Sequence, residues 1–301
     1  MKKRIFLRFL LVIIFLTSIF MAVLYTYHKN DVIYWKDFYS SEIKRCSDIY
    51  DFSNESCKNI NQYKESLADI NNSSHSVPVM FDYLFSTKEV LQIVPLLIAI
   101  LIGGISVIDF SSKIKSKSFK QDIDREGYKK FMISNILGSY IYSLIIPLFI
   151  IIVIGILSIY CNGNFSNPDA FWTEYVVIKE KYVYYFFIMI VSSLFIGLYY
   201  INLAFISFYK YKKYLLNLLL FFILFISLET ILPVIIELLD FYTINTIFPS
   251  YSLSTSTLFN YSTYEYDILF FLMSSVMHFL VSFIILVFIY KSKERFFITN
   301  S

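Results

Sequence analysis

Long apolar runs alternate with shorter polar segments along this chain of 301 residues. Six of the runs are long enough to cross a bilayer, which takes roughly 20 residues. They cover about 6–27, 89–108, 132–160, 183–208, 214–238 and 268–290. The pattern predicts an all-α, polytopic membrane protein with six transmembrane helices, built as a single transmembrane domain over residues 1–301.

The first apolar run follows the basic start MKKRIFLRFL, which suits either a signal peptide or a first membrane helix. The run from Ile5 to Tyr27 is long for a signal sequence, and no A-x-A cleavage site follows it. We therefore expect an uncleaved first helix.

Charge predicts the orientation of the helices. Only 16% of the residues are charged, too few to cover a soluble domain of this length. Lysine and arginine concentrate on the cytoplasmic side of membrane proteins. With the N-terminus inside, 17 of the 26 Lys and Arg fall in the inner segments 1–8, 109–131, 209–214 and 291–301. Both termini are therefore predicted to be cytoplasmic, and the small net charge of +3 gives no indication of nucleic-acid binding.

The first outer segment, residues 28–88, is the only loop large enough to form a subdomain. Its stretches KDFYSSEIKRCSDIYDF and CKNINQYKESLADI predict helices. Cys46 and Cys57 lie in this loop, and outside a cell they could form a disulfide. Two free thiols are the alternative, and the sequence leaves both open. Cys161 stands alone at an outer helix end.

Three carboxylates lie in and just after the fifth run, at Glu229, Glu237 and Asp240. Pro233 breaks or kinks this helix, which places Glu237 and Asp240 outside the span. Residues 233–264 are too polar to span, and we expect them to form an outer re-entrant hairpin before the last helix. Glu229 is a candidate intramembrane polar site, with a position near water at the helix break as the alternative.

Sequence motifs for catalysis are absent. The chain has no P-loop, no G-x-S-x-G, no H-E-x-x-H and no C-x-x-C. His278 lies inside the last run and is a second candidate intramembrane polar site, with packing or an interhelical hydrogen bond as the alternative. We predict no enzyme activity, no catalytic residue and no bound cofactor or metal. The inner loops are also too short for a nucleotide-hydrolysing domain.

A charged segment, KSFKQDIDREGYKKF, separates the second and third runs. Ser118 and Gln121 form an S-x-x-Q capping box, which starts a helix. Gly127 is placed to end that helix in a left-handed cap. Phe119 and Ile123 share a face, because they lie four residues apart. The segment predicts a short helix that needs a surface to dock on, with a solvated loop as the alternative.

This arrangement resembles the permease subunits of type-2 ABC transporters. The shared features are six spans, a large first outer loop, a short cytoplasmic helix between spans two and three, and a Pro-broken fifth span. A basic segment of the type R-x-G-Y-K-K-F/Y-x-x-S-K-I leads into the third span of that family. Its positions are held here by Arg125, Gly127, Tyr128, Lys129, Lys130 and Phe131. Asn135 stands where the family often has lysine, and IFPSYSLS is similar to the family's segment before the sixth span.

The resemblance implies an exporter subunit that pairs with a second permease, identical or different, in the bilayer of a bacterial plasma membrane. Cytoplasmic ABC ATPases, carrying ATP and Mg, would drive it, and the usual cargo is a drug, an antimicrobial peptide, a lipid or a glycan. Region 114–130 would be the coupling helix, with the Phe119 and Ile123 stripe inserted into a groove on the ATPase. The residues implied in coupling are Phe119, Lys120, Ile123, Asp124, Arg125, Gly127 and Tyr128.

Two other classes remain open from the sequence. One is an ion-coupled secondary transporter or channel that uses Glu229 and His278. The other is a membrane immunity or receptor protein that acts through residues 28–88. Co-purification of an ATPase, ion-driven uptake without one, and function of the isolated loop would separate the three classes.

Overall fold

A computed structural model of the chain describes residues 2–48, 60–73, 76–86, 88–116, 119–165, 182–209, 213–228 and 268–291. Every regular element in these residues is a helix, so the predicted all-α class is confirmed for them. The chain divides into two compact units, Met1–Val90 with Phe149–Tyr185 and Leu91–Leu148 with Phe186–Ser301.

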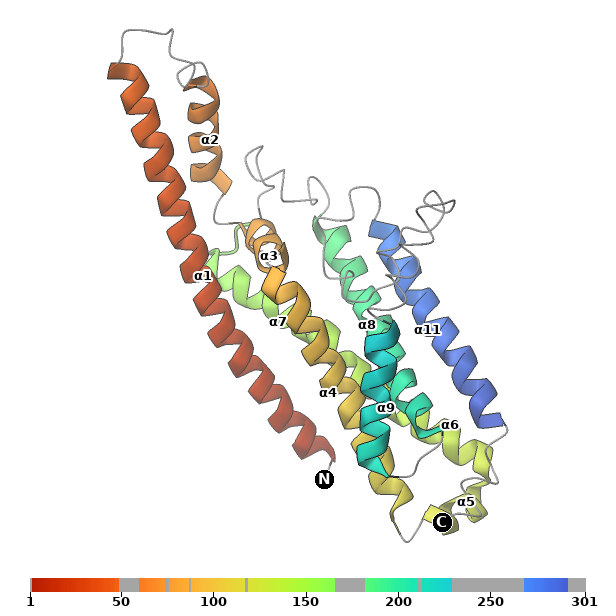
Figure 1. The fold of residues 1–301 in the computed structure, drawn as a ribbon. Coiled ribbons are helices and arrows are strands. Elements are labelled where there is room, and N and C mark those ends of the chain that lie inside the picture. Colours follow the sequence, from red (N-terminus) through yellow and green to blue (C-terminus); the bar gives the residue numbers. More distant parts are fainter. Residues whose placement is uncertain are drawn as a thin grey trace, which may run out of the picture. The chain divides into compact units, whose positions relative to one another are not determined.

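The first unit contains α1 (Lys2–Asp48), α2 (Ile60–Ser73), α3 (Val77–Ser86) and most of α7 (Ile145–Tyr160). The second unit contains the remaining helices (Figure 1). They are α4 (Lys88–Ile114), α5 (Phe119–Glu126), α6 (Tyr128–Ser139), the 3-10 helices η2 (Tyr140–Leu144) and η4 (Ser207–Tyr209), α8 (Tyr182–Ile206), α9 (Tyr214–Ile226) and α11 (Ile268–Lys291).

Four helical segments among the described residues are long and apolar enough to cross a membrane: Leu97–Ile114, Tyr128–Tyr160, Phe186–Ile206 and Phe271–Lys291. They correspond to the second, third, fourth and sixth predicted runs. The fifth run is represented by α9, a shorter apolar helix, and the first run lies within α1. Residues 233–264 lie outside the described residues. The six-span count, the orientation of the termini and the re-entrant hairpin therefore stay predictions.

The helix α1 joins the first predicted span to the helix predicted over KDFYSSEIKRCSDIYDF, whose described part is present. It continues from the predicted end of the first span, near Tyr27, to Asp48 without a break. No glycine or proline lies between these residues to stop it. At 1.5 Å per residue, the part beyond Tyr27 is about 30 Å long.

The extension of α1 packs against α2, as Figure 1 shows. Aromatic rings take part in this contact. The ring centroid of Tyr39 in α1 lies 5.7 Å from that of Tyr63 in α2. Within α1, the ring of Tyr39 also stacks on that of Trp35, with 5.8 Å between the centroids. Burial raises the pKa of the Tyr39 hydroxyl, against the opposite effect of its hydrogen bond with Ser66. The predicted helix CKNINQYKESLADI is thus present in its described part, and its apolar side faces α1.

The helix α3 was not predicted from the sequence. Its first backbone N–H, at Val77, donates a hydrogen bond to the carbonyl of Asn164 at 2.8 Å. Val79, Met80 and Phe81 are buried, and this short apolar helix fastens the segment before α4 to the end of α7.

Helices of the second unit approach closely at two glycines. A methyl group on Gly197 in α8 would lie 2.8 Å from the backbone of Ser143 in η2. A methyl group on Gly103 in α4 would overlap the ring of Phe221 in α9. Small residues at helix interfaces permit such backbone contact in membranes, where dispersion and not the hydrophobic effect drives association.

Replacing Gly197 with alanine should lower thermal stability, because the added methyl forces η2 away from α8. The expected cost is about 1–3 kcal/mol, the usual penalty of overpacking. Gly138→Ala is the matched control, since no atom lies within 4 Å of the added methyl. Thermal unfolding in detergent, followed by circular dichroism, measures both. Equal melting temperatures for the two variants would contradict the close contact at Gly197.

Candidate functional site

The charged segment between the second and third runs folds as the eight-residue helix α5, as predicted. Its apolar stripe faces the chain itself. Phe119 is 2% exposed and Ile123 5% exposed, and the ring of Phe119 meets the ring of Phe131 edge to face at 5.3 Å. This differs from the expectation that the stripe inserts into a partner protein. So short a helix is marginal alone, and the nearest apolar surface is the start of α6.

The opposite side of α5 is polar and exposed. Its exposed residues are Gln121, Asp124, Arg125 and Glu126. The side chain of Lys120 lies outside the described residues, as does Ser118 of the predicted capping box. A partner that meets α5 would therefore contact a charged surface.

Gly127 is the single residue between α5 and α6. Its φ is +77°, the positive value predicted for it, but its ψ of 144° is extended and not left-handed helical. Its N–H donates to the carbonyl of Ile123 at 2.8 Å, and its own carbonyl accepts from the N–H of Phe131 at 3.0 Å. One glycine thus ends one helix and begins the next, in a conformation that disfavours other residues. Tyr128, which follows it, is buried.

Three polar residues, Asp109, Lys113 and Asn135, connect the end of α4 to α6 beside α5, and this place is called the polar corner below. The ammonium of Lys113 donates to Oδ1 of Asn135 at 2.6 Å and lies 3.5 Å from the carboxylate of Asp109. The Nδ2 group of Asn135 donates to the carbonyl of Phe131 at 2.8 Å. Asn135 is the position that departs from the family pattern, and its amide here accepts from a lysine on another helix.

A cavity of about 430 Å³ opens at this polar corner. It is lined by Ser112, Lys113, Ser116, Asp122, Phe131 and Asn135. The residues come from the end of α4 and the turn after it, from α5 and from α6, so the cavity lies where these three helices meet. Lys113 and Asp109 were not predicted as site residues, although their i, i+4 spacing is a signal for an ion pair on a helix.

A second polar site links three helices inside the apolar region. The hydroxyl of Tyr140 in η2 donates to Oδ1 of Asn202 in α8 at 2.8 Å. The Nδ2 group of Asn202 donates to the hydroxyl of Ser282 in α11 at 3.0 Å. Asn202 is fully buried, and the contact falls where a 3-10 turn interrupts the third span. Asparagines inside apolar runs were the signal that could have indicated this site.

His278 lies in α11, and its ring is held by its own helix. Its Nδ1 is 2.8 Å from the carbonyl of Ser274, and its ring meets that of Tyr199 edge to face at 5.3 Å. Because a carbonyl only accepts, this contact needs the proton on Nδ1. Glu229 lies outside the described residues, so the pair stays untested. Among the residues described, no group of three or more His, Cys, Asp and Glu could hold a metal ion.

The cysteines of the outer loop are described only in part. Cys46 is buried near the end of α1 and is disulfide-bonded. Cys57 lies outside the described residues, so the pairing of Cys46 with Cys57 stays a prediction. Cys161, just after α7, is a free and buried thiol, and burial raises its pKa to about 11.

Asn202→Leu should lower the stability of the protein, because the hydroxyls of Tyr140 and Ser282 lose an amide partner. Interhelical hydrogen bonds of this kind contribute about 0.6–2 kcal/mol. Asn217→Leu is a matched control: Asn217 is equally buried in α9, but its amide has no hydrogen-bond partner among the described residues. Thermal unfolding in detergent should show a loss for the first variant and none for the second. A similar change in both would argue against the three-helix network.

No protein-family model, no curated protein and no solved structure matches this chain significantly.

Proposed function

We propose that this chain is the membrane-spanning subunit of an ATP-driven ABC exporter, energised by a separate cytoplasmic ATPase. The observation that carries the proposal is α5: a short helix between two spans, bounded on both sides, anchored by apolar side chains and charged on its exposed face. A solvated connector needs none of these features. A helix that transmits force between a partner and the membrane needs all of them.

The packing supports a specific route for that force. A push on the exposed face of α5 reaches α6 through the ring contact of Phe119 with Phe131. It reaches α4 through the hydrogen bond of Lys113 to Asn135. Two membrane helices therefore respond together, as in a shear or rigid-body movement of packed helices. The cavity at the polar corner leaves room for such a shift.

The coupling residues divide into two groups in this proposal. Phe119, Ile123 and Gly127 hold α5 in place on the chain. Asp124 and Arg125 face the ATPase. In this arrangement the charged residues, and not the apolar stripe, provide the partner contact.

The subunit would pair with a second permease, identical or different, and the ATPase would supply the ATP and Mg site. The proposed cargo is hydrophobic or amphipathic. In the ion-coupled alternative the Nε2 of His278 would have to act, because the Nδ1 of that ring is engaged by its own helix. The immunity or receptor alternative depends on residues 28–88 and is tested by that fragment alone.

Cysteine labelling tests the orientation that the proposal requires. Ser116→Cys should be protected from a membrane-impermeant maleimide in intact cells, and Asn30→Cys should react, because the lysine and arginine bias places α5 inside. Both positions are exposed. A Cys161→Ser background removes the free, buried thiol among the described residues, whose pKa burial raises to about 11. Labelling of the first site alone would reverse the orientation and remove the proposal.

Charge reversal on α5 tests the partner contact. Arg125→Glu should weaken capture of a co-purifying ABC ATPase about tenfold or more, because like charges across an interface repel. Lys44→Glu, an exposed charge reversal on α1, is the control and should leave ATPase capture unchanged.

Phe119→Ser with Ile123→Ser should retain more of the ATPase than Arg125→Glu does, but it should uncouple ATP hydrolysis from transport, because α5 loses its anchor on α6. If no ATPase co-purifies with the unaltered chain, the proposal fails at its first step.

A further inference from the structure

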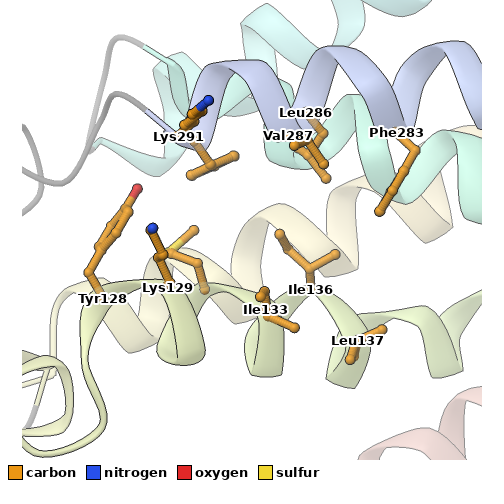
Figure 2. A pocket seen from close by; sticks show the side chains of 11 residues that line it. Tyr128, Lys129, Ile133, Ile136, Leu137, Phe283, Leu286, Val287 and Lys291 are labelled. Carbon is orange, nitrogen blue, oxygen red and sulfur yellow. The ribbon is translucent and has the colours of Figure 1, made fainter.

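A largely apolar groove of about 420 Å³ runs between α6 and α11. Both helices belong to the second unit of the chain. The groove is lined by Tyr128, Lys129, Met132, Ile133, Ile136, Leu137, Phe283, Leu286, Val287, Tyr290 and Lys291. Figure 2 shows Tyr128, Lys129 and Lys291 at one end, and Leu137 and Phe283 toward the other.

The floor of the groove is formed by buried side chains, among them Met132, Ile136 and Leu286. Its rim is formed by exposed ones, including Ile133 and Val287. The groove is therefore open along its length to whatever surrounds the helices, and that side is hydrocarbon if the two spans are inserted in a bilayer.

Two lysines make the charged end. Lys129 is the second residue of the span Tyr128–Tyr160, and Lys291 is the last residue of the span Phe271–Lys291. Both ammonium groups are exposed and lie at the same end of the groove, so they share one membrane surface. No acidic residue lines the groove. Within the described part of the chain, neither lysine is in an ion pair with a carboxylate.

We propose that this groove binds an anionic phospholipid, with one acyl chain along the floor and the phosphate between Lys129 and Lys291. The lysines complement the headgroup charge, and the length of apolar lining suits a hydrocarbon chain. A free phosphate would leave the apolar part empty. A zwitterionic lipid would bring a cationic group close to the two lysines. This site requires only that the helices span a membrane, and it does not depend on the proposed transport.

Native mass spectrometry of the detergent-purified chain, titrated with phosphatidylglycerol, tests the site. Lys129→Gln with Lys291→Gln should weaken binding about 30-fold, since each lysine near an anionic headgroup contributes about a factor of five. Lys130→Gln with Lys213→Gln is the control, because it removes the same charge from exposed lysines at helix starts that do not line the groove. It should leave the affinity unchanged, and phosphatidylcholine should bind the unaltered chain much more weakly.

A second variant keeps both lysines and blocks the apolar part. Val287→Trp places a large ring from an exposed rim position over the groove, and it should also weaken phosphatidylglycerol binding. Unchanged helicity and gel-filtration behaviour show that each variant is folded. Equal binding of the two lipids, equal loss in the Lys130 and Lys213 control, or full displacement of the lipid by inorganic phosphate would each overturn the proposal.

Discussion

In a bilayer every backbone N–H and C=O group needs a partner inside the protein, because lipid offers none. Helices meet this constraint in the four apolar segments that are long enough to span, and a polar side chain buried there is costly unless it has a hydrogen-bond partner. The amide of Asn202 meets the constraint through Tyr140 and Ser282. The ring of His278 meets it through the carbonyl of Ser274. The helices then hold together through close contacts, such as that of Gly197 in α8 with Ser143 in η2.

The polar corner between α4, α5 and α6 follows a different rule. The helix α5 is charged and exposed on one side, and it is too short to be stable without an apolar anchor. Phe119 and Ile123 supply that anchor by packing on the start of α6. The result is a helix whose position is fixed by apolar side chains and whose outer surface is charged. One face of α5 thus anchors the helix, and the other is left exposed.

Properties that are local in sequence could be predicted here, and properties that depend on distant residues could not. The apolar runs predicted the second, third, fourth and sixth spans, because span length is set by bilayer thickness. Spacing and a glycine predicted α5, because capping and helix periodicity act within a few residues. The direction of the Phe119 stripe was not predictable, since it depends on which surface lies nearest after folding.

The hydrogen-bond network of Asn202 was missed because its partners are distant in sequence. Tyr140, Asn202 and Ser282 are 62 and 80 residues apart, and an isolated polar residue in an apolar run does not reveal its partner. The continuity of α1 was missed for the opposite reason, since its two parts were predicted as separate helices. Its composition changes from apolar to polar near Tyr27, but nothing in the backbone chemistry of the following residues stops a helix.

The rigid extension of α1 has an electrostatic consequence. With the predicted span 6–27 in the bilayer, the far end of the helix can stand about 30 Å from the headgroups. The Debye length is about 10 Å at an ionic strength of 0.1 M, so the field of a charged membrane surface has largely decayed at that height. In that arrangement the tip near Arg45 would lie in bulk electrolyte, where the charge of the membrane surface neither attracts nor repels approaching ions.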